Sequence, residues 1–125
     1  MVALTINSCS YNVDCLELFF KSVEKNIGFD YFSNIYLFIN ECDYVAPEGV
    51  TTIVYDSEQS YTEQMNYCLA QVKEEVLLYA NEDYLFYAPA NKHIANDLLE
   101  VLNKDENLSF IKFCHTNMER YPVYD

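Results

Sequence analysis

The stretch that decides the fold is VLLYANED at residues 76–83, where an uninterrupted apolar run ends in three amide or acidic side chains. A run that is apolar at every position is typical of a strand covered on both faces, as strands of parallel sheets are. The polar tripeptide marks the carboxyl end of this strand. Ligands of parallel α/β sheets bind at that edge.

Four other segments predict strands by the same reasoning. Residues 2–6, 35–39 and 51–55 precede the deciding stretch, and residues 108–114 follow it. Each is a short run rich in apolar and β-branched side chains, which favours a strand. The sequence therefore predicts five strands, of which residues 76–80 form the fourth.

Three helical patterns separate these strands. The first has apolar side chains at i, i+3, i+4, i+7 and i+11 from Leu16, follows a capping-box pattern at residues 14–17, and ends at Gly28. A second capping-box pattern, at residues 60–63, opens the second helix. An apolar stripe that starts at Ile94 predicts the third.

Strands that alternate with helices predict an α/β fold, namely a Rossmann-like three-layer sandwich with a mostly parallel sheet and right-handed crossovers. No linker or repeat interrupts residues 1–125, so we expect one domain. If the first and fourth strands are neighbours, residues 7–12 and 81–87 line a crevice at their carboxyl ends.

The charge balance narrows the choice of partners. The chain carries 7 Lys and Arg against 20 Asp and Glu, a net charge of −13. Such a surface repels nucleic acid and anionic membranes, and it repels a phosphorylated ligand unless a cation bridges the two. We therefore expect no nucleic-acid partner.

The cysteines and the hydropathy indicate a cytoplasmic protein. The 5 Cys are odd in number and form no Cys-x-x-Cys pair, so we expect free thiols in a reducing compartment. No apolar run approaches the roughly 20 residues that span a bilayer. We expect no membrane span.

Several common motifs are absent from the sequence. With only 2 Gly there is neither a Gly-x-Gly-x-x-Gly fingerprint nor a phosphate-binding P-loop. There is no Gly-x-Ser-x-Gly elbow either. These absences exclude the usual forms of dinucleotide-binding, P-loop and α/β-hydrolase proteins.

The tripeptide Asn81-Glu82-Asp83 is the main candidate for chemistry. Its oxygen atoms are ligands that Mn²⁺ or Mg²⁺ accepts, and such an ion can bridge a diphosphate to an acidic protein. The plainer interpretation is a solvated turn in which Asn81 or Asp83 caps its own backbone.

Residues 61–83 resemble a stretch of GT-A-fold glycosyltransferases of the family 2 type. In that family a helix bearing Ala-Arg-Asn precedes a strand and an Asp-x-Asp metal motif. Here QMN at residues 64–66 takes the place of Ala-Arg-Asn, residues 77–80 take that of the strand, and NED at residues 81–83 takes that of Asp-x-Asp. The loop at residues 7–12 is similar to the family's first loop, which cradles base and ribose.

The resemblance implies a nucleotide-diphospho-sugar donor, with a UDP-sugar favoured, and an unknown acceptor. It implies metal ligation by Asp83 and Asn81. It also implies that Asp56 contacts uracil or ribose. The full set of implied nucleotide-sugar-binding residues is Ser8, Tyr11, Asn12, Asp56, Asn66 and Glu82.

Some of these residues have plainer interpretations. Tyr11 could be an ordinary half-buried aromatic, Asn12 could cap the first helix, and Asn66 could be a polar position on a helix rim. The chain also departs from the family, because Met65 stands where Arg is usual and Asn81 stands where Asp is usual.

Two classes of function remain open. In the family, the acceptor-binding half and the catalytic base follow this region, so the resemblance implies a minimal enzyme, a truncated one or a nucleotide-sugar binder. A homodimer that shares surface between copies stays open. The alternative is a non-catalytic acidic α/β module that binds a protein or a nucleotide.

Overall fold

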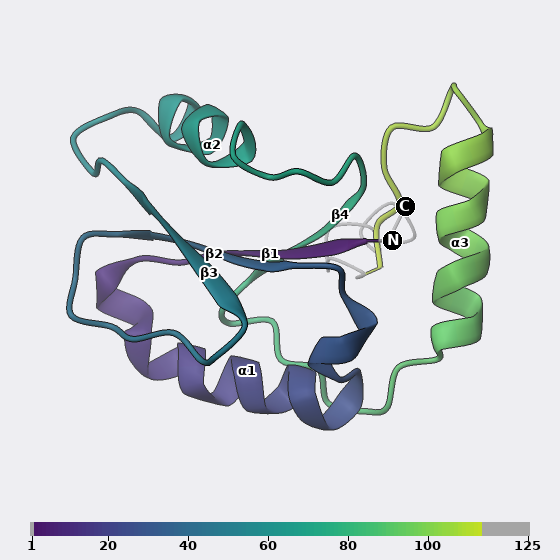
Figure 1. Ribbon diagram of the computed structural model, residues 1–125, viewed down its shortest axis with the longest axis horizontal. Coiled ribbons are helices and arrows are strands. Elements are labelled where there is room, and N and C mark those ends of the chain that lie inside the picture. The colour runs from purple at the N-terminus through teal and green to yellow at the C-terminus, as the bar shows by residue number, and fades with distance from the viewer. Residues whose placement is uncertain (1, 114–125) are drawn as a thin grey trace, which may run out of the picture. The chain divides into compact units, whose positions relative to one another are not determined.

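The computed structural model describes residues 2–113 and divides the chain into two compact units, Met1–Ala90 and Asn91–Asp125 (Figure 1). The first unit contains β1 (Ala3–Asn7), η1 (Ser10–Asn12), α1 (Val13–Asn26), η2 (Phe29–Tyr31), β2 (Ile35–Asn40), β3 (Val50–Tyr55), α2 (Tyr61–Leu69) and β4 (Leu77–Asn81). The second contains α3 (Lys92–Lys104). That residues 1–125 act as one domain stays a prediction.

The four strands form one sheet in the order β3-β2-β1-β4, and every neighbouring pair is parallel. The chain builds the sheet from β1 outward through β2 to β3 and then returns to place β4 on the other side of β1. Strand order thus reverses between β1 and β4. The predicted α/β, Rossmann-like fold with a parallel sheet is confirmed.

Helices cover both faces of the sheet, with α1 on one side and α2 on the other (Figure 1). The apolar face of α1 buries Leu16, Phe19, Phe20 and Val23. The core on the α2 side consists of Ala3, Tyr36, Phe38, Ile53, Tyr55 and Cys68, with Met65, Val72 and Leu77 packed against it. Because side chains alternate along a strand, each central strand serves both cores.

The two predicted capping boxes had different outcomes. At α2 the box is present, since Ser60 accepts from the Glu63 amide and Glu63 accepts from the Ser60 amide. At α1 the box at residues 14–17 is wrong. The helix already begins at Val13, and its N-cap Asn12 makes no side-chain capping bond.

The second unit confirms one prediction and corrects another. Helix α3 forms as expected, with the Asn91 side chain accepting from the Ile94 amide. The predicted strand at residues 108–114 is wrong for residues 108–113, which carry no strand ladder, and Cys114 lies outside the described residues. An apolar run becomes a strand only where another strand's backbone pairs with it.

Two further expectations concern the thiols and the membrane. Cys9, Cys15, Cys42 and Cys68 are free thiols, as predicted. Over residues 2–113 no helix combines the length and the apolarity that a membrane crossing requires.

The amino ends of the strands are tied together by Glu74, in the loop before β4. Its carboxylate accepts hydrogen bonds from the Ser33 hydroxyl at 2.7 Å, from the Asn34 amide, and from the Tyr36 hydroxyl at 3.1 Å. These bonds, the one from Asn34 foremost and then the one from Ser33, lower the pKa of Glu74 to about 2. The ionised carboxylate therefore fastens the start of β2 to the start of β4.

We expect Glu74→Gln to lower the melting temperature at pH 7 by about 4 °C, because it weakens bonds worth about 1 kcal/mol. The folded pKa lies below the unfolded value, so this stability is present above the unfolded pKa and is lost as pH falls toward about 2. Circular dichroism melts from pH 7 down to pH 2 should show the melting temperatures of wild type and variant converging. Glu75→Gln, which changes the exposed neighbouring residue, is the control. An unchanged gap at low pH would contradict this role.

Candidate functional site

The carboxyl ends of β1 and β4 meet at the point where strand order reverses. Asn7 and Asn81 end these strands and face each other in register. The loops that follow, at residues 8–12 and 82–87, therefore start side by side. The first and fourth strands are thus neighbours, which is the condition for a crevice between these loops, and ligands of open α/β sheets bind at such a place.

In the tripeptide at the carboxyl end of β4, one carboxylate is buried and the other is exposed to solvent. Glu82 is only 6% exposed, and its Oε1 accepts a 2.6 Å hydrogen bond from Asn12 Nδ2. Asp83 is exposed, and the turn closes with the Tyr84 amide donating to the Asn81 carbonyl at 3.1 Å. Asp83 is thus the accessible carboxylate, while Glu82 joins the two loops.

The loop after β1 is held by bonds to β2 and β3. Ser8 is 4% exposed, its amide donates to the Phe38 carbonyl at 2.9 Å, and its carbonyl accepts from the Tyr55 hydroxyl at 2.7 Å. The Ser10 amide donates to Asn40 Oδ1 at 2.7 Å. Ser8 therefore serves the loop's own structure here, rather than presenting its side chain to solvent.

Tyr11 and Asn12 differ from their plainer interpretations. The Tyr11 ring is 92% exposed, so it is not a half-buried aromatic and its face is open to a planar group. Asn12 stands at the N-cap position of α1, but its side chain binds Glu82 instead of the helix amides.

Asp56 and Asn66 come from elements other than this pair of loops. Asp56 follows β3, the strand at the far edge of the sheet from β4, and its Oδ1 accepts from the Glu58 amide at 2.9 Å. Three strand spacings separate β3 from β4, which is about 14 Å. Asn66 is exposed on α2. The structure therefore brings together Ser8, Asn12 and residues 81–83, and it places Asp56 after the strand at the opposite edge of the sheet.

Two tyrosines beside the site were missed by the sequence reasoning. The hydroxyls of Tyr61 and Tyr79 lie 3.2 Å apart, and the Tyr79 hydroxyl donates to Asn81 Oδ1 at 3.4 Å. Burial, followed by the bond with Tyr61, raises the pKa of Tyr79, so the phenol stays neutral. Strict alternation along β4 places residues 79 and 81 on one face and could have revealed Tyr79, whereas no local pattern indicates that Tyr61 of α2 lies beside it.

The thiol of Cys15 on α1 lies in an acidic environment. Desolvation first, and then the carboxylates of Asp14 and Glu82, raise the pKa of Cys15. A thiol is nucleophilic as the thiolate, so this environment disfavours Cys15 as a nucleophile.

The donor set fits a metal ion that arrives with a phosphorylated ligand better than a protein-only cage. Within residues 2–113 no three His, Cys, Asp or Glu side chains converge on one metal position. Mg²⁺ is commonly held by one or two carboxylates together with substrate phosphates. Asp83 offers one exposed carboxylate of this kind, and Asn81 Oδ1 accepts a hydrogen bond from the Tyr79 hydroxyl.

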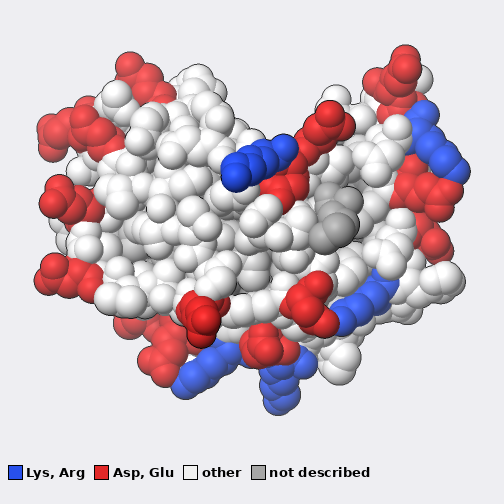
Figure 2. Space-filling view, viewed as in Figure 1, with Lys and Arg blue, Asp and Glu red and all other residues white. Residues whose placement is uncertain are grey.

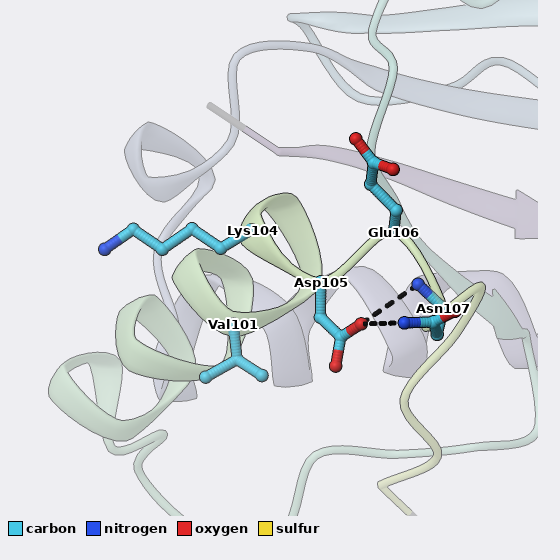
Figure 3. Close-up of a pocket in the computed structure, with 5 residues that line it drawn as sticks. All are labelled: Val101, Lys104, Asp105, Glu106 and Asn107. Atoms are coloured by element: carbon cyan, nitrogen blue, oxygen red, sulfur yellow. Dashed lines mark hydrogen bonds between the residues drawn. The ribbon is translucent and has the colours of Figure 1, made fainter.

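Two hollows of the surface lie away from the predicted site. One, in the second unit, is lined by Val101, Lys104, Asp105, Glu106 and Asn107, and Figure 3 shows the Asp105 carboxylate accepting both bonds from Asn107. Another lies against α1. Neither is lined by a residue of the predicted site.

Comparisons with known proteins assign no family to the chain. No protein-family model matches the sequence, and a search of curated proteins returns no significant match. The resemblance of residues 61–83 to glycosyltransferases stays a prediction.

The bond between Asn12 and Glu82 can be tested by exchanging its two ends. Asn12→Asp should destabilise by about 1–3 kcal/mol, because a second carboxylate then faces buried Glu82. Adding Glu82→Gln restores one amide and one carboxylate, so the double variant should recover most of the loss. Thermal melts at pH 7 measure this, with Asn66→Asp as the control for added charge. If the double variant loses as much unfolding free energy as Asn12→Asp and Glu82→Gln lose together, the two side chains are not coupled.

Proposed function

We propose that the chain is a metal-dependent glycosyltransferase domain that binds a nucleotide-diphospho-sugar, with a UDP-sugar favoured, and transfers the sugar to an acceptor. One observation carries the proposal. Residues 81–83 stand at the reversal of strand order between β1 and β4, and Asp83 is turned to solvent beside a loop that is already fixed in place. The resemblance of residues 61–83 to the GT-A family supports the same function.

The protein's residues have distinct tasks in this proposal. The exposed ring of Tyr11 stacks on the base, since flat aromatic rings suit planar partners. Asp83, with Asn81, receives Mn²⁺ or Mg²⁺ together with the diphosphate. Glu82 holds the loop of Asn12 in place.

The net charge makes a bridging cation necessary. At −13 the protein repels a nucleoside diphosphate before any contact is made. A divalent ion, when bound, offsets the charge that develops on the departing nucleoside diphosphate. Binding of the nucleotide should therefore depend on the metal, and this is the property to measure.

We expect UDP to raise the melting temperature only when Mn²⁺ is present. A ligand at about 100 times its dissociation constant stabilises by about 2.7 kcal/mol, which corresponds to several degrees in a domain of this size. Melts with UDP, GDP, CDP and TDP, each with and without Mn²⁺, identify the base. Asp83→Ala should abolish the shift while leaving the unliganded melt unchanged, and Asp30→Ala, at an exposed carboxylate on η2, should keep it.

Other outcomes point to other functions. If no nucleotide shifts the melt at millimolar concentration, the glycosyltransferase proposal fails and the non-catalytic module becomes the better interpretation. If a nucleotide binds without metal and equally well to Asp83→Ala, the metal role of Asp83 is wrong. If metal-dependent binding is found, incubation with the matching nucleotide-sugar tests for release of the nucleoside diphosphate.

A further inference from the structure

A second surface of the first unit has the form of a docking groove. It lies between the outer side of α1 and the loop at residues 41–49 that joins β2 to β3, which run alongside each other in Figure 1. The hollow encloses about 470 Å³. Its lining consists of Glu17, Phe20, Lys21, Glu24, Phe29, Tyr44, Val45 and Pro47.

The middle of the groove is apolar. Phe20, Phe29, Tyr44 and Pro47 come from three segments and meet around one hollow, and Val45 stands on the loop with 86% of its surface exposed. An apolar side chain that enters the hollow removes its own surface and that of Val45 from water, which is favourable. The groove therefore has room and driving force for one apolar anchor.

The loop wall of the groove ends in a turn. The Val50 amide donates to the Pro47 carbonyl at 3.1 Å, and Gly49 adopts φ +86°, a conformation that few other residues accept. This turn leads the loop from the groove into β3.

Carboxylates outnumber cations around the groove. Glu17 and Glu24 of α1 line it, and Glu41, Asp43 and Glu48 are exposed on the loop that carries its other wall. The one cation of the lining, Lys21, is paired with Glu17 at 2.6 Å. Acidic side chains also predominate over basic ones on the face seen in Figure 2. A partner with Lys or Arg beside its anchor would meet attraction on both sides of the hollow.

We propose that this groove docks a basic peptide segment of a partner protein, with one leucine or phenylalanine seated in the hollow and lysine or arginine on either side. The charge around the groove selects this occupant over an acidic one. A second copy of the chain is disfavoured, because each copy carries −13. The proposal does not depend on the glycosyltransferase function, since no residue of that site lines the groove.

A short peptide tests the proposal directly. Isotope-labelled protein is titrated with a blocked pentapeptide of sequence Lys-Leu-Phe-Lys-Lys while the amide chemical shifts are followed by NMR. We expect saturable shifts confined to residues 17–29 and 43–48. The affinity should fall severalfold when the salt concentration rises from about 50 to about 300 mM, because exposed charges are then screened. The charge-reversed peptide Glu-Leu-Phe-Glu-Glu should leave these shifts unchanged.

Matched variants localise the contact. Val45→Ser should weaken binding about fivefold by removing apolar surface from the hollow. Val54→Ser makes the same change at another exposed position, on β3, and should have no effect. Equal binding of both peptides, shifts that fall outside the groove, or equal behaviour of the two serine variants would each overturn the proposal.

Discussion

The structure depends on the burial of β1 between two parallel neighbours. Residues 3–6 have no exposed surface, and β1 pairs with β2 on one side and with β4 on the other. A strand buried on both faces must satisfy all of its backbone groups through its neighbours, which fixes its register. The buried hydroxyl of Thr5 is also hydrogen-bonded, because it donates to the Leu78 carbonyl at 3.4 Å. The positions of the loops that follow β1 and β4 at the carboxyl edge of the sheet therefore depend on this strand.

The buried carboxylate of Glu82 follows from the same constraint. The register places Asn81 opposite Asn7, so the next residue along the chain enters the space beside the loop after β1. A carboxylate there must be hydrogen-bonded to be tolerated, and Asn12 supplies the bond. The turn then leaves Asp83 outside. A structural carboxylate and an accessible one are thus adjacent in sequence and serve different purposes.

The sequence could predict what depends on local apolar burial, and could not predict what depends on side-chain direction or on a pairing partner far along the chain. The apolar runs placed β1 to β4, and the polar tripeptide placed the ligand edge, because both signals are local. The inward turn of Glu82 and its bond to Asn12 join loops seventy residues apart, and no local pattern encodes them. The strand expected at residues 108–114 failed at residues 108–113 for a related reason, since its apolar residues say nothing about a pairing partner.

Both proposed sites would bind positively charged groups, because the surface of the protein is acidic. An anionic protein attracts cations, and the edge beside Asp83 and the groove beside α1 would use them differently. At the sheet edge, Asp83 would hold a divalent ion that offsets the charge of a diphosphate. At the groove, the carboxylates would attract lysine or arginine side chains of the proposed peptide. A chelator removes only the first kind of cation, whereas monovalent salt weakens mainly the second, because screening acts most on exposed charges. The two surfaces can therefore be separated experimentally in the unaltered protein.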